Sequence, residues 1–245
     1  MMTGKENIFR THFTIRSYEV GANQKTTIST IADLFQESAG LHAKKLNFDI
    51  TDLHELGLTW VLYKLHIKVL RFPERWEKVW VKTWPSTGKD IRAYRSYEME
   101  DESNQLLAKA LGQWMTLDVE NRRPRRIPDQ LSHFPLLKQS GNDLISDRNY
   151  IAPADRKKPE LIASVGNYDL DMNNHVNSVK YLDWSTGYQL KEPHLQCDEV
   201  IIQHQAEAHY GDKIYRVAVD LENQQKITLF NSDGLALSTA IVSFI

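Results

Sequence analysis

The sequence predicts an α+β protein made of two similar halves, each an antiparallel sheet wrapped around one long helix. Shifted by 150 residues, the stretch SYEVGANQKTTISTIADL at 17–34 aligns without a gap with NYDLDMNNHVNSVKYLDW at 167–184. In each half this stretch has a helical pattern, and strand-like runs follow it. A long apolar helix followed by several antiparallel strands is buried most simply when the sheet wraps around the helix.

The predicted helices have apolar inward faces. In the first half the inward positions are Ile28, Ile31, Ala32, Leu34, Phe35 and Ala39. In the second half Val179, Leu182 and Trp184 have a similar spacing. This periodicity is typical of a helix that packs one side against a sheet.

Alternation of apolar and polar residues predicts the strands. The strand-like runs are 63–72, 78–84 and 106–118 in the first half, and 198–212, 213–221 and 235–245 in the second. The two closing strands match at an offset of 130 residues. We expect the two sheets to pair edge to edge, because this would leave fewer free edges.

A segment rich in proline and charge separates the halves. We therefore predict a first domain at 1–118, a linker with one short helix at 119–160, and a second domain at 161–245.

Composition excludes several classes of protein. The 245 residues are 41% hydrophobic and carry a net charge of −2, so charge does not favour nucleic acid or a membrane surface. No run of about 18 apolar residues could span a bilayer, and the first ten residues do not resemble a signal peptide. A single cysteine, Cys197, permits neither an internal disulfide nor a cysteine-rich metal site, so we expect a reduced, cytoplasmic setting.

The stretch DMNNH at 171–175 carries the strongest candidate site. Asp171, Asn173 and His175 stand at the predicted mouth of the second helix, whereas the first half has Gly21, Asn23 and Lys25 at the aligned positions. A helix N-cap would explain Asp171 or Asn173 alone. The difference between the halves favours chemistry in the second half and binding in the first, with one active site per chain.

Glu207 is a second candidate, within a half-apolar stretch that we predict to be a strand. Aligning His66 with His204 places Val69 opposite Glu207, so the second half again has the charge. An exposed strand residue is the alternative reading.

The remaining candidates are weaker. Cys197, in a predicted loop, is interpreted as a bystander, and the histidine spacing does not suggest zinc. The tryptophans of the first half indicate either core packing or an apolar ligand tunnel. The RRPRR run at 122–126 suits either a solvated linker or a site for an acidic partner.

DMNNHVNSVKYLDW at 171–184 resembles the D-x-N-x-H-V-N-N-x-K-Y motif of acyl-acyl carrier protein thioesterases, the plant plastid enzymes and their bacterial relatives. The runs at 36–46, 57–85 and 121–129 look like that family's first helix, following strands and arginine-containing linker. The resemblance implies a tandem (double) hotdog fold and hydrolysis of the thioester between a fatty acyl chain and acyl carrier protein. It assigns catalysis to Asp171, Asn173, His175 and Glu207, without a cofactor or metal. The plant enzymes have a cysteine directly after this glutamate; here Ala208 excludes a cysteine nucleophile.

The resemblance also implies a partner, acyl carrier protein with its phosphopantetheine-linked acyl chain. We expect docking on Arg122, Arg123, Arg125 and Arg126, and selection of acyl-chain length by Leu34, Phe35, Leu41 and Trp60. Free backbone N–H groups at 174–177 would stabilise the oxyanion. The identity of the base, Asp171 or Glu207, stays open, as does direct attack by a carboxylate to give an anhydride intermediate. The oligomeric state, a homodimer included, also stays open. Alternatives are a coenzyme A thioesterase of the same superfamily and a non-catalytic acyl-binding protein.

Overall fold

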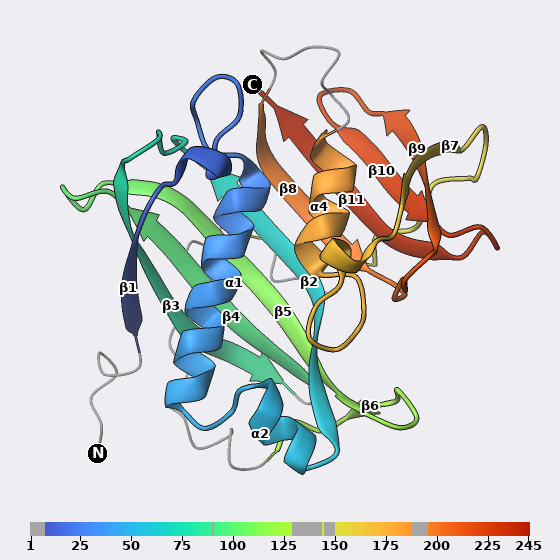
Figure 1. Ribbon diagram of the computed structural model, residues 1–245, viewed down its shortest axis with the longest axis horizontal. Coiled ribbons are helices and arrows are strands. Elements are labelled where there is room, and N and C mark those ends of the chain that lie inside the picture. Colours follow the sequence, from blue (N-terminus) through green and yellow to red (C-terminus); the bar gives the residue numbers. More distant parts are fainter. Residues whose placement is uncertain (1–7, 90, 129–143, 145–149, 188–195) are drawn as a thin grey trace. The chain divides into compact units, whose positions relative to one another are not determined.

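The computed structural model describes residues 8–89, 91–128, 144, 150–187 and 196–245 (Figure 1). The chain divides into two compact units, 1–146 and 147–245. Each unit has its own path of antiparallel strands and its own helix. Among the described residues, no helix has the length and apolar character needed to cross a membrane.

The sheet of the first unit follows the order β1-β3-β4-β5-β2, with antiparallel neighbours, and β6 pairs with β5. The strand bounds are β1 Phe9–Thr14, β2 Leu58–Val69, β3 Lys78–Lys89, β4 Arg92–Glu100, β5 Leu106–Asp118 and β6 Pro124–Arg125. The strand predicted at 106–118 is confirmed, and β2 begins five residues earlier than expected. Because β6 lies in this sheet, the predicted linker begins as part of the first unit.

The sheet of the second unit repeats this connectivity in the order β7-β9-β10-β11-β8. Its strands are β7 Glu160–Ser164, β8 Cys197–His204, β9 Lys213–Asp220, β10 Gln225–Phe230 and β11 Ala236–Phe244. The structure confirms the strands predicted at 213–221 and 235–245 to within a residue. Most of the predicted linker helix's segment, 129–143 and 145–149, lies outside the described residues.

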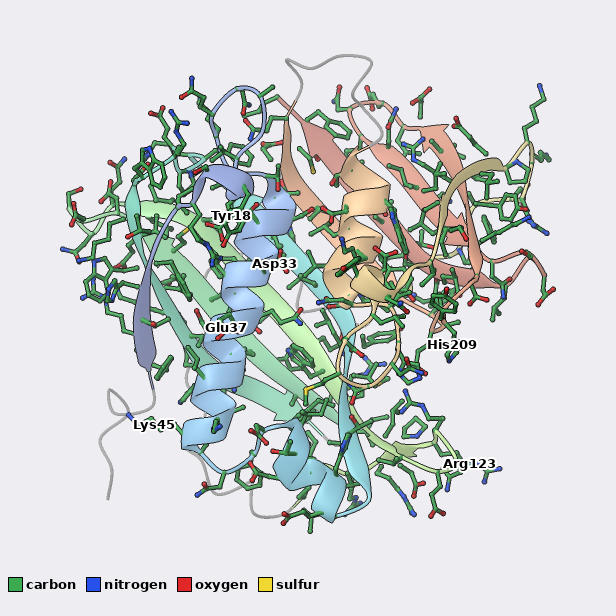
Figure 2. The ribbon with its side chains drawn as sticks, in the orientation of Figure 1. Tyr18, Asp33, Glu37, Lys45, Arg123 and His209 are labelled. Atoms are coloured by element: carbon green, nitrogen blue, oxygen red, sulfur yellow. The ribbon has the colours of Figure 1, made fainter. Side chains whose placement is uncertain are left out.

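The predicted helices are present. In Figure 1, α1 (Ile28–Lys45) lies along one face of the strands of the first unit, and α4 (Ser178–Thr186) lies on the strands of the second unit, against β8, β10 and β11. All six predicted inward residues of α1 are at most 7% exposed. Asp33 and Glu37, labelled in Figure 2, are exposed on the other side of the helix. A short helix that we did not predict, α2 (Ile50–Glu55), starts at the N-cap Asp49.

The 150-residue repeat is confirmed in local detail. The 3-10 turns η2 (Ser17–Glu19) and η3 (Asn167–Asp169) stand at equivalent positions before the helices. Isolated bridges then join Val20 to Thr26 and Leu170 to Val176. The two helices begin at equivalent positions, 28 and 178.

The prediction that Val69 is the counterpart of Glu207 is wrong. In β2, Val69 pairs with Ala108, and in β8, His204 pairs with Ser238 at the equivalent register. After each strand two successive N–H groups donate to one carbonyl. After β2 the donors are Leu70 and Arg71 and the acceptor is Leu107; after β8 the donors are Gln205 and Ala206 and the acceptor is Leu237. The counterpart of Glu207 is therefore Phe72, and Glu207 lies in the turn after β8 rather than in a strand.

A buried histidine makes the first unit sensitive to acid. His42 on α1 is 3% exposed, and its Nδ1 lies 3.0 Å from the Arg95 guanidinium. Burial, reinforced by the charge of Arg95, lowers the pKa of His42 from 6.5 to about 4. Because the unfolded chain binds the proton more readily, this contribution to stability is complete above pH 6.5 and disappears as pH falls towards 4.

We therefore expect the free energy of unfolding to drop by about 2 kcal/mol more between pH 7 and pH 5 in the wild type than in His42→Gln. Urea titrations at the two pH values measure this difference. His12→Gln, at an exposed position on β1, serves as the control. An identical pH dependence in His42→Gln and the wild type would contradict the prediction.

Candidate active site

The loop that carries the motif has the same backbone in both halves. Asp171 N–H donates to the His175 carbonyl at 2.7 Å, and Asn174 N–H donates to the Asp171 carbonyl at 3.0 Å. In the first half Gly21 and Gln24 make the same two bonds, each at 2.9 Å. Gln24 and Asn174 have φ values of 62° and 63°, so both loops turn through the left-handed region at the same place.

The carboxylate of Asp171 is fixed by this loop. Its Oδ1 accepts the N–H groups of Asn173 at 2.8 Å and His175 at 3.3 Å, and its Oδ2 lies 3.4 Å from Asn173 Nδ2. In the first half the Asn23 side chain accepts the Lys25 N–H at 3.0 Å instead. A loop with glycine at the position of Asp171 therefore forms, and the fold alone does not require this acid.

The helix N-cap is a different residue. Asn177 Oδ1 accepts the N–H of Val179 at 3.0 Å, so neither Asp171 nor Asn173 caps α4. The prediction that backbone N–H groups at 174–177 are free for an oxyanion is wrong. The N–H of Asn174 donates to the Asp171 carbonyl, and that of His175 donates to Asp171 Oδ1. The N–H groups of Val176 and Asn177 donate to the carbonyls of Ala208 and Asp169.

The turn after β8 brings Glu207 to the motif. Glu207 Oε2 lies 3.7 Å from His175 Nε2, although 31 residues separate them in sequence. Both side chains are partly open to solvent, at 34% and 24% exposure. The turn is attached to the loop because Val176 N–H donates to the Ala208 carbonyl at 3.0 Å.

Three further residues lie beside this site and were not predicted from the sequence. The His209 ring, labelled in Figure 2, contacts the His175 ring edge-on at 5.0 Å. Tyr181 is buried, and burial together with the charges of Glu207, Asp212 and Asp171 raises the pKa of its phenol. Its ring contacts His204, whose pKa burial lowers to about 4. At neutral pH both groups are therefore uncharged.

The residues predicted to select acyl-chain length differ in their exposure to solvent. Leu34 and Phe35 are buried in α1, and Trp60 donates from Nε1 to the Phe48 carbonyl. Leu41 is 41% exposed, because His42 takes the inward position in that turn. Leu41 is thus a poor candidate for a pocket wall.

The arginine cluster is only partly available to a partner. Arg123, Arg125 and Arg126 are all exposed, but Arg125 is paired with Asp118 at 2.9 Å. Figure 2 labels Arg123, which lies next to β6.

Cys197 is the first residue of β8 rather than part of a loop. It is 7% exposed, and burial raises the pKa of its thiol, which makes a thiolate nucleophile unfavourable. Within the described part of the chain, no group of three or more histidine, cysteine or acidic residues could hold a metal ion.

Comparison with known proteins identifies the family. The model of the acyl-ACP thioesterase N-terminal domain matches residues 6–134, and that of the C-terminal domain matches residues 154–239. The chain belongs to the acyl-ACP thioesterase family. Its members include a chloroplastic oleoyl-acyl carrier protein thioesterase of Coriandrum sativum, 29% identical over 195 residues, which cover 72% of this chain and 52% of the relative. An acyl-acyl carrier protein hydrolase of Cuphea viscosissima is 31% identical over 193 residues, covering 72% and 45%.

Solved structures of the family share the fold. An acyl-ACP thioesterase from Bacteroides thetaiotaomicron matches with a TM-score of 0.86 at 21% identity, over 100% of both chains. The 12:0-ACP thioesterase of Umbellularia californica matches with a TM-score of 0.85 at 21% identity, over 97% of both chains. The chain spans about half the length of the curated relatives it matches.

Proposed function

We propose that this chain hydrolyses the thioester of fatty acyl-acyl carrier protein and releases a free fatty acid. The observation that carries the proposal is the placement of Asp171, His175 and Glu207 around one loop and one turn of the second unit. The aligned positions of the first unit hold Gly21, Lys25 and Phe72 on the same backbone. Family membership and the activities for which the relatives are named point to the same reaction.

The structure favours Glu207 as the general base. Asp171 uses Oδ1 to accept two backbone N–H groups, so its carboxylate is suited to holding the loop in shape. The Glu207 side chain is 34% exposed and faces His175. In the proposed step Glu207 takes a proton from water while the water oxygen attacks the thioester carbonyl carbon.

Charge then develops on the carbonyl oxygen. Because the backbone N–H groups at 174–177 are already engaged, the amide of Asn173 is the better donor. One of its two N–H bonds points to Asp171 at 3.4 Å, which leaves the second for the oxyanion. When the carbon–sulfur bond breaks, the proton held by Glu207 passes to the leaving thiolate, either directly or through His175.

We also propose that each unit is a hotdog and that the chain is a tandem of two. The repeated order of strands and the helix on each sheet support this. The first unit would bind the acyl chain along α1, where Leu34 and Phe35 are buried, and the second would perform the chemistry.

Hydrolysis of matched substrates tests the function. The purified chain is given one fatty acid attached either to acyl carrier protein or to coenzyme A, and thiol and fatty acid release are measured. We expect kcat/KM to be at least about tenfold higher for the carrier-protein substrate, because the protein surface adds contacts that coenzyme A lacks. A preference for coenzyme A would identify the other thioesterase class, and binding without hydrolysis would identify an acyl-binding protein.

A further inference from the structure

A buried phenol holds the turn that carries Glu207. Tyr181 on α4 is 3% exposed, and its hydroxyl oxygen accepts the N–H of Ala208 at 2.9 Å. Ala208 is fully buried, and its carbonyl accepts the N–H of Val176 at 3.0 Å. The residue directly after Glu207 is therefore bonded on one side to the helix and on the other to the loop that carries His175.

The first unit has the same turn without the phenol. The counterparts of Tyr181 and Ala208 are Ile31, which has no hydroxyl, and Pro73, which has no N–H. The second bond is retained, since Thr26 N–H donates to the Pro73 carbonyl at 2.9 Å. In the first unit, where Phe72 replaces Glu207, the same turn therefore forms with an isoleucine and a proline at the positions of Tyr181 and Ala208.

We propose that Tyr181 is a positioning residue for Glu207, an inference that rests on the proposed function. Glu207 lies outside the strand ladder, so the sheet does not fix its backbone. The bond from Ala208 to the phenol adds to the bond from Val176 to the Ala208 carbonyl, and together they keep the Glu207 carboxylate beside His175. A displacement of about 1 Å in a reacting group can lower a rate by about 100-fold, so a constraint of this kind has a measurable effect.

The ring of Tyr181 also has packing contacts, which must be separated from the effect of the hydroxyl. It meets the rings of Trp184 and His204 edge-on, at centroid distances of 5.7 and 5.3 Å. Tyr181→Phe keeps these contacts and removes only the acceptor of the Ala208 N–H.

The test compares Tyr181→Phe with the wild type on acyl-acyl carrier protein. We expect kcat to fall at least about tenfold while KM stays within about twofold, because the proposed function assigns acyl-chain binding to the first unit. Tyr168→Phe, at a residue 99% exposed, is the matched control and should leave both constants unchanged.

A second variant distinguishes an effect on catalysis from a loss of folding. Tyr181→Phe leaves a buried N–H without its acceptor, whereas Tyr181→Phe/Ala208→Pro removes both partners and copies the proline of the first unit. We expect the double variant to fold, as judged by its thermal transition, and to keep the low kcat. A folded variant of either kind with kcat within twofold of the wild type would overturn the role of Tyr181. A wild type that hydrolyses neither thioester would instead overturn the proposed function.

Discussion

Glu207→Gln is expected to lower kcat by about 10²- to 10⁴-fold, the usual contribution of a general base. The substitution keeps the size and polarity of the side chain and removes its ability to accept the proton of water. Since Glu207 lies in a turn and is 34% exposed, the fold should be unaffected. Single-turnover hydrolysis of acyl-acyl carrier protein measures the chemical step, and circular dichroism confirms folding.

The first unit shows which residue can stand in place of Asp171 while the loop still forms. Asp171→Gly copies Gly21, around which the equivalent loop of the first unit forms. We expect this variant to fold and to lose at least about tenfold in turnover, because the carboxylate no longer orients Asn173 and the loop. Asp183→Asn, at an exposed position on α4, is the control. Near-wild-type turnover in both Glu207→Gln and Asp171→Gly would remove this site from consideration.

Reversing two exposed arginines should change the choice between substrates. Acyl carrier proteins are acidic, and this chain has little net charge, so under the proposed function a local basic cluster would attract the partner. We expect Arg123→Glu/Arg126→Glu to lower kcat/KM on the carrier-protein thioester by about tenfold, mainly through slower association, and to spare the coenzyme A thioester. The loss should shrink as salt is added. Kinetics on both substrates at two ionic strengths measure these effects.

The structure identifies the arginine to leave out of that variant. Arg125 pairs with Asp118 at 2.9 Å, so a glutamate there would place two carboxylates together and disturb the β5–β6 pairing. Arg125→Gln serves as the control for a structural effect. Equal losses on both substrates in Arg123→Glu/Arg126→Glu would mean that these arginines hold their own segment in place.

The repeat could be predicted from the sequence because the conformation of each loop depends on residues that are close together in the chain. The turn before each helix contains bonds between residues three or four apart, such as Asp171 N–H to the His175 carbonyl. The inward face of α1 was likewise readable from its spacing. The family motif then gave Asp171, Asn173 and His175 their expected roles, which stay proposals.

Long-range bonds account for the errors. The alternation of apolar residues continues past His204, but two successive N–H groups donate to the Leu237 carbonyl and end the strand. The alignment of His66 with His204 was also wrong by three residues, because the strand register makes Val69 the counterpart of His204 and hence Phe72 that of Glu207. The N–H groups of Val176 and Asn177 are occupied by the carbonyls of Ala208 and Asp169, which a helix-terminus argument does not reveal. The bond from Ala208 to Tyr181 spans 27 residues and has no signature in the sequence.

In the proposed function, chemistry belongs to the second unit and depends on three side chains that the first unit lacks. The most direct test rewrites the second site with the residues of the first, as Asp171→Gly/His175→Lys/Glu207→Phe. Fatty acid release from acyl-acyl carrier protein is then measured for the folded variant and the wild type. We expect a folded protein that still binds the acyl chain and hydrolyses the thioester at least about 1,000-fold more slowly. A folded triple variant with turnover within tenfold of the wild type would contradict it, because the reaction would then occur elsewhere in the chain.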